Sequence, residues 1–182
     1  MFHHRSGLAA AAVSGILMMA GTAAAQEKGG KAAGGGQTVT TTSTTYNGWT
    51  VVCTAQGKDK PKPQACTATF RVINQQNRAN LLVWMFGFNA NGEPLTEVLT
   101  LPDVLIAPGV QIKLGDAEPL KADFVSCNVN GCKASMPVSS AAAKLLKAAK
   151  SAGIGVTRSD GKSMQFNLEI GGLEHALRDL GL

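Results

Sequence analysis

Two closely spaced cysteine pairs constrain this chain more than any other feature of its sequence. Cys53 and Cys66 enclose the string TAQGKDKPKPQA, and Cys127 and Cys132 enclose NVNG. Four cysteines permit three pairings, and each local pair brackets a plausible connection between two adjacent strands. Opposed residues in a non-hydrogen-bonded antiparallel pair have Cα atoms about 4.5 Å apart, within disulfide reach. We therefore predict two local disulfides, Cys53 with Cys66 and Cys127 with Cys132.

Other uses of the cysteines fit the spacing less well. A tetrahedral zinc site typically uses C-x2-C pairs, and a thiol oxidoreductase uses C-x-x-C at the start of a helix. Neither spacing occurs here, and the context of CNVNGC is strand-like. A redox-sensitive bridge and a metal site remain the alternatives, and the sequence predicts no metal ligands and no cofactor.

The N-terminal residues have the layout of a secretory signal peptide. Arg5 precedes an apolar run from Leu8 to Ala20, and small residues follow up to Ala25. This order of a basic start, an apolar stretch and an A-x-A site predicts cleavage near Ala25. We expect a periplasmic, secreted or outer-envelope location, which is oxidising enough for disulfides. No later apolar run reaches the roughly 20 residues of a membrane span, so no transmembrane segment is expected in the mature chain.

Charge narrows the classes of partner. The formal net charge is +5 and is spread along the chain without dense Lys/Arg clusters, so nucleic-acid binding is not expected. A modest positive charge favours an anionic surface, or an envelope or host protein that carries one. The strongest local feature is the loop between the first two cysteines, which we predict to be exposed. Its candidate partner contacts are Lys58, Lys60 and Lys62.

The pattern of apolar residues predicts an all-β domain. Residues 26–45 are rich in Gly, Ala and Thr and are expected to form a disordered tether, whereas residues 46–182 alternate short apolar runs with turn strings such as NQQN, ANGEP and SDGK. Many short strands with few helices favour a two-sheet sandwich. The expected strands cover residues 49–54, 66–74, 80–89, 97–101, 111–114, 122–128, 132–138, 154–158 and 165–170.

Two helices are expected after the strands of CNVNGC. Ser139 or Ser140 can cap the helix-forming string AAAKLLKAAKSAG, and Gly153 can close it. Its lysines, Lys144, Lys147 and Lys150, would form one basic stripe, with Leu145, Leu146, Ala148 and Ala149 buried on the other side. A second short helix is predicted over residues 173–180.

The sequence carries no recognisable catalytic constellation. His175 is the one histidine that remains after signal cleavage. It would need Glu174 or Asp179 to orient it as a general base, and a polar position on the last helix is the better interpretation. No G-x-S-x-G elbow, H-E-x-x-H string or phosphate-binding loop accompanies it. We therefore assign no catalytic residue.

Several strings together resemble the invasion-associated locus B family of Gram-negative bacteria. They are GWTVVC (48–53), LPDVLIAPGVQIKLGD (101–116), FVSCNVNGCKASM (124–136) and LEIGGLEHALRDL (168–180). The resemblance spans about residues 46–181, although Leu173 stands where the family usually has an aromatic residue. It implies an immunoglobulin-like β-sandwich with two disulfides and no known catalytic activity. In pathogenic members it implies a contribution to host-cell entry.

These observations together predict an exported binding or structural protein of the envelope that is not an enzyme. Two alternatives stay open. A small periplasmic hydrolase or thiol-dependent enzyme would depend on one reactive group, such as His175 or a free cysteine. An envelope assembly chaperone would need an exposed apolar patch or an open sheet edge.

Overall fold

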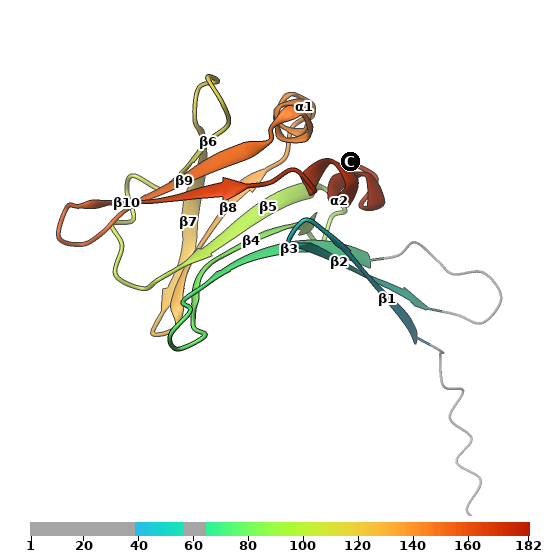
Figure 1. Ribbon diagram of the computed structural model, residues 1–182, viewed down its shortest axis with the longest axis horizontal. Helices are drawn as coiled ribbons and strands as arrows, with labels where there is room; N and C mark the ends of the chain where they lie inside the picture. The colour runs from blue at the N-terminus through green and yellow to red at the C-terminus, as the bar shows by residue number, and fades with distance from the viewer. Residues whose placement is uncertain (1–38, 57–64) are drawn as a thin grey trace, which may run out of the picture. The chain divides into compact units, whose positions relative to one another are not determined.

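The computed structural model describes residues 39–56 and 65–182, and Figure 1 shows the arrangement of their elements. Ten strands and two short helices make up this part of the chain, so the predicted all-β class is confirmed. The strands are β1 (Val39–Tyr46), β2 (Trp49–Gln56), β3 (Ala65–Ile73), β4 (Asn80–Phe88), β5 (Pro94–Thr100), β6 (Val110–Lys113), β7 (Leu120–Asn128), β8 (Gly131–Pro137), β9 (Ser151–Thr157) and β10 (Ser163–Glu169). The helices are α1 (Ser140–Ala148) and α2 (Leu173–Asp179).

All strand pairs are antiparallel and join into one sheet with the order β1-β2-β3-β4-β5-β8-β7-β6-β9-β10. Strand β7 connects the two parts of this sheet. Its first residues, Leu120 to Ala122, pair with β6, and its later residues, from Asp123 onward, pair with β8. The register shifts between Phe124 and Ser126, and a bulge of this kind bends a strand and increases its twist. The sheet is thus continuous and curled, and the two-sheet immunoglobulin-like arrangement stays a prediction.

An aromatic cluster forms the centre of the core under β2, β3 and β4. Trp49, Trp84 and Phe86 are fully buried, and the ring centroids of each pair lie between 5.3 and 5.5 Å apart. The Trp84 indole N–H donates to the Thr96 hydroxyl at 2.8 Å, and that hydroxyl donates to the Met85 carbonyl oxygen. Burying such a side chain contributes about 2–3 kcal/mol. The two hydrogen bonds offset the burial of the Trp84 and Thr96 polar groups, whereas the Trp49 indole N–H has no hydrogen-bond partner among the described residues. This cluster fixes β2, β3 and β4 as one layer.

Helix α2 closes one end of the core. Leu173, Ala176 and Leu177 are buried, and the helix contacts β1, β2 and β3. Gly172 precedes it, and a Cβ atom there would lie 2.1 Å from the Tyr46 carbonyl oxygen. The Gly171-Gly172 pair of the sequence therefore allows the chain to pass close beneath the β1–β2 hairpin. In the described part of the chain, no helix is long and apolar enough to cross a membrane.

The structure confirms all nine expected strands and the existence of both helices, and it corrects three expectations. Residues 39–45, which were placed in the tether, form most of β1. The first helix ends at Ala148 and not at Gly153, because Ala152, Ile154 and Val156 bury alternate side chains in β9. The buried face of α1 also differs from the expected one: Ala142 and Leu146 are buried, whereas Leu145 is exposed. The predicted signal peptide (1–25) and the remaining tether (26–38) lie outside the described residues.

Candidate functional site

The hairpin of β7 and β8 carries the Cys127–Cys132 disulfide, whose sulfur atoms are 2.04 Å apart. Asn128 pairs with Gly131 next to it, so the turn contains only Val129 and Asn130. Gly131 has a positive φ, at 150°. A Cβ atom on Gly131 would lie 2.3 Å from the Thr100 carbonyl oxygen. The glycine of CNVNGC is therefore required by the close approach of β5 to the hairpin.

The second disulfide joins β2 to β3. Cys53 and Cys66 are paired in register, both are buried, and their sulfur atoms are 2.05 Å apart. The described residues include all four cysteines of the chain, and both disulfides together use all four. A thiol-dependent reaction thus has no free thiol in this structure. The predicted partner contacts Lys58, Lys60 and Lys62 fall between β2 and β3 and lie outside the described residues.

Residues 101–109, the loop between β5 and β6, are held at two points. At the first point, the Cys132 sulfur packs 3.7 Å from the Pro102 carbonyl oxygen, which is a packing contact because a disulfide sulfur has no hydrogen to donate. At the second, the Leu105 amide donates to the Thr157 carbonyl oxygen at 2.8 Å, and Val104 forms an isolated bridge with Arg158. Backbone contacts with the end of β9 therefore fix this loop, and the disulfide hairpin packs against its first residues.

An ion pair and a hydroxyl group add to the second attachment. The Arg158 guanidinium lies 2.7 Å from the Asp103 carboxylate, and the Ser159 hydroxyl donates to the other carboxylate oxygen. The bonds from Ser159 and Arg158 lower the pKa of Asp103 below its ordinary value, and the bond to Asp103 raises the pKa of Arg158. Asp160 also lies within 3.9 Å of Arg158. These groups are solvent-exposed, so their attraction is weakened by water and salt.

Three large apolar side chains are exposed on the loops held in this way. Leu105 and Ile106 are 40% and 52% exposed in the 101–109 loop, and Val129 is 90% exposed at the tip of the hairpin. We call the loop 101–109 with the turns 128–131 and 158–162 the loop-end surface. Exposed apolar residues on fixed loops are typical of protein-binding surfaces. The loop-end surface thus combines apolar side chains with the charges of Asp103, Arg158 and Asp160.

His175 lies on α2 against the β1–β2 hairpin. Its ring stacks on Tyr46, with the ring centroids 5.5 Å apart. The two carboxylates that could orient His175 as a base bind other groups. Glu174 accepts a hydrogen bond from Arg178 at 3.1 Å, and Asp179 accepts one from the Tyr46 hydroxyl at 2.8 Å. The hydrogen bond to Asp179 and the burial of the phenol raise the pKa of Tyr46. The structure places His175 in a packing contact between hairpin and helix.

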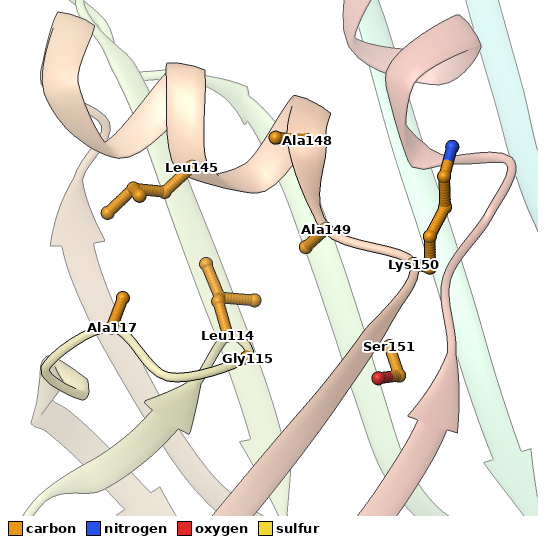
Figure 2. A pocket seen from close by; sticks show the side chains of 8 residues that line it. All are labelled: Leu114, Gly115, Ala117, Leu145, Ala148, Ala149, Lys150 and Ser151. Atoms are coloured by element: carbon orange, nitrogen blue, oxygen red, sulfur yellow. The ribbon is translucent and has the colours of Figure 1, made fainter.

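A shallow apolar hollow of about 380 Å³ lies between the end of α1 and the turn that follows β6. Figure 2 shows Leu114, Ala117 and Leu145 facing this hollow, whereas the Lys150 side chain extends away from it. Lys150 lies beyond the helix, so the predicted basic stripe on α1 is reduced to Lys144 and Lys147. The hollow offers contact to a small apolar group, and the ammonium group of its one charged lining residue, Lys150, lies away from it.

The sequence prediction found the disulfides but missed the loop-end surface. The strings LPDV (101–104) and APG (107–109) have the composition of turns. The two apolar residues between them, Leu105 and Ile106, are the available signal, although the sequence does not show that they are exposed. Among the described residues, no group of three or more His, Cys, Asp or Glu side chains is placed to hold a metal ion.

Comparison with known proteins gives a family and a similar solved structure. The family model described as "Invasion associated locus B (IalB) protein" matches residues 49–181, a range that contains both disulfides and the loop-end surface. The crystal structure of invasion associated protein b from Bartonella henselae is similar with a TM-score of 0.62 and 19% sequence identity. That similarity covers 76% of this chain and 95% of the other, and at this identity it shows a shared fold. No curated protein matches the chain.

Proposed function

The chain belongs to the invasion associated locus B family, and from this premise we propose that it is an exported, non-enzymatic binding or structural protein of the bacterial envelope. The observation that carries the proposal is the loop-end surface. Leu105 and Ile106 are exposed on a loop that is attached to the end of β9 by the Leu105–Thr157 backbone hydrogen bond and the Val104–Arg158 bridge. A fixed apolar surface binds with a smaller loss of conformational entropy than a mobile one.

Export is supported by the pairing of the cysteines. Both disulfides require an oxidising compartment in most bacteria, and the signal-peptide layout of residues 1–25 supplies the route. We propose cleavage near Ala25 and a periplasmic or outer-envelope location. Mass spectrometry of the protein from the fractionated envelope tests this directly, because cleavage after Ala25 gives a chain that begins at Gln26. Recovery of the uncut chain in the cytoplasm with reduced cysteines would contradict export.

The layer structure of an immunoglobulin-like sandwich is part of the same proposal. Buried residues from both parts of the curled sheet belong to one hydrophobic cluster, for example Val51 and Trp84 from one part and Ile112 and Ile154 from the other. We infer that the two parts act as the two facing layers, with β7 passing between them. This arrangement leaves the loops at the strand ends free to bind, as in other sandwiches.

The role of the loop-end surface is tested by replacing Leu105 and Ile106 with serine in the chromosomal gene. We expect the variant protein to be exported at wild-type amounts but to reproduce the phenotype of a deletion strain in envelope integrity or host-cell entry. The matched control replaces Gln76 and Asn77, which are exposed on the turn after β3, with serine. Wild-type behaviour of the Leu105/Ile106 variant would remove this surface from the proposal.

Lys58, Lys60 and Lys62 remain proposed contacts to an anionic partner. Replacement of all three by alanine removes three positive charges, and replacement by arginine keeps them. We expect binding to vesicles that contain anionic lipid to fall in the alanine variant and to persist in the arginine variant. Equal binding by both variants would exclude this loop as an electrostatic contact.

A further inference from the structure

Strand β1 is at one end of the sheet, and no other strand of residues 39–56 and 65–182 pairs with its outer edge. In the described residues, β2 is the strand that pairs with it, and every residue from Val39 to Thr45 is exposed. The strand VTTTSTTY contains neither proline nor a charged residue. Proteins usually protect edge strands with charges, proline or bulges, because an open edge can pair with another chain. A long uncharged edge strand is therefore a candidate interaction surface.

The hairpin geometry shows which backbone groups point outward. Tyr46 pairs with Trp49 across a two-residue turn in which Asn47 and Gly48 both have positive φ, at 43° and 88°. In such a turn the flanking residues form a hydrogen-bonded pair, and hydrogen-bonded and non-hydrogen-bonded pairs then alternate along the strands. The backbone N–H and C=O groups that point toward β2 thus belong to residues 40, 42, 44 and 46. The outward N–H and C=O groups belong to Val39, Thr41, Ser43 and Thr45.

The first disulfide supports this assignment independently. If Cys53 is hydrogen-bonded to Thr42 on one side, it is in a non-hydrogen-bonded pair with Cys66 on the other. The Cα atoms of Cys53 and Cys66 are 4.0 Å apart, which is the short spacing of a non-hydrogen-bonded pair. The hydrogen-bonding direction along β1 is therefore fixed from two sides.

We propose that β1 pairs antiparallel with β1 of a second copy of this chain, about a two-fold axis at Thr42. In this register Thr41 lies opposite Ser43 and Val39 lies opposite Thr45, so outward groups meet outward groups and about eight backbone hydrogen bonds form. Thr42 faces its own copy, and Thr40 faces Thr44. Thr–Thr and Thr–Ser pairs are favourable across strands, and no like charges come together. A second copy of β1 therefore supplies complementary backbone groups and side chains, whereas a foreign peptide would do so only by chance.

This pairing would make one continuous sheet from two molecules and would present two loop-end surfaces in each assembly. Two surfaces on one assembly bind a repetitive envelope partner more tightly than one, without any additional contact. The pairing does not depend on what the loop-end surface binds, so its test is separate from the test of the proposed function.

Sedimentation of the mature chain over a concentration series tests the pairing. We expect a reversible monomer–dimer equilibrium that Ser43→Pro weakens at least about tenfold, because proline removes an outward N–H and blocks the edge. Ser43→Ala keeps this N–H and is the matched control, so it should dimerise like the wild type. A wild-type chain that stays monomeric at millimolar concentration overturns the proposal, as does association that Ser43→Pro leaves unchanged.

A charge-complementation experiment tests the two-fold axis without proline. Thr42→Lys and Thr42→Asp should each abolish self-association, because like charges would face each other across the axis. An equimolar mixture should restore a heterodimer that weakens with added salt. Unchanged circular dichroism and retention of both disulfides show that the variants are folded. Failure of the mixture to associate, when each variant alone has lost association, would overturn the register centred on Thr42.

Discussion

Tyr46 and Asp179 lie 133 positions apart in the sequence, and the Tyr46 hydroxyl donates to the Asp179 carboxylate at 2.8 Å. The bond ties the end of β1 to the last helix, above the site where Gly172 passes close to the Tyr46 carbonyl oxygen. The stacked ring of His175 completes this contact. The first and last described elements of the domain are thus joined at one corner.

The first prediction concerns the titration of Tyr46. It is the only tyrosine in the chain, so the near-ultraviolet absorbance change of phenolate formation reports on it alone. The hydrogen bond to Asp179 raises its pKa above the ordinary value of 10.0. Asp179→Asn should lower the titration midpoint of Tyr46 toward 10.0. Glu174→Gln is the control and should leave the midpoint at its raised, wild-type value. Equal midpoints in the wild type and the Asp179 variant would contradict the bond.

The same shift has a consequence for stability at high pH. A raised pKa means that the folded state binds the phenol proton more tightly than the unfolded state. The stabilisation is fully present below pH 10.0 and is lost as the pH rises through the folded-state pKa. Thermal midpoints of the wild type and Tyr46→Phe should therefore converge at alkaline pH.

The second prediction concerns Asp103 at low pH. Its pKa is lowered by the bonds from Ser159 and Arg158, so the folded state binds this proton more weakly than the unfolded state. The stabilisation is present above the ordinary value of 3.8 and is lost as the pH falls through the lowered pKa. Asp103→Asn should lower the thermal midpoint at neutral pH, and the difference should vanish in acid. A difference that persists unchanged into acid would show that the ion pair is not its cause.

The third prediction concerns Gly131. In Gly131→Ala, the added methyl group would meet the Thr100 carbonyl oxygen at 2.3 Å, and φ is 150°. We expect a loss of more than about 2 kcal/mol of unfolding free energy. Gly92 also has a positive φ, of 79°, but an added Cβ has no atom within 4 Å. Gly92→Ala should therefore cost only about 1 kcal/mol. Equal costs in urea unfolding would argue against the close approach of β5.

The fourth prediction ranks the two disulfides. On the loop-entropy model, the bridge with sequence separation 13 contributes about 3 kcal/mol and the bridge with separation 5 about 2 kcal/mol. Replacing Cys53 and Cys66 together by serine should therefore destabilise the domain more than replacing Cys127 and Cys132. The reverse order would show that packing at the hairpin, where Cys132 is buried, outweighs the loop entropy.

Most of the fold could be predicted from the sequence, because alternating burial leaves a period of two in β2, β5, β6 and β9, and β4 is a short apolar run. Strand β1 could not, since both its faces are exposed and its residues are mostly threonine. The pairing with β2 holds this strand in the sheet without apolar burial. The end of α1 was also mispredicted, because Gly153 and its neighbours pair with β6 and β10. Tertiary pairing there overrides the helix preference of the preceding alanines.

The candidate site was harder to predict than the fold. Its parts come from residues 101–109, 128–131 and 158–162, and no local pattern indicates that these segments meet. The pairing of β5 with β8, the Val104–Arg158 bridge and the contact of Asp103 with Arg158 bring them together. The sequence indicated instead the segment with Lys58, Lys60 and Lys62, because charged residues can be recognised in a sequence. The exposure of an apolar pair on a fixed loop cannot.

The most direct test of a binding role is crosslinking in intact cells of the protein's own organism. A photoreactive amino acid replaces Ile106 on the loop-end surface, or Gln76 on the turn after β3 as the control. We expect one recurrent envelope or host protein to be joined to position 106 and to be absent at position 76. The same scatter of abundant neighbours from both positions would contradict a binding role for the loop-end surface.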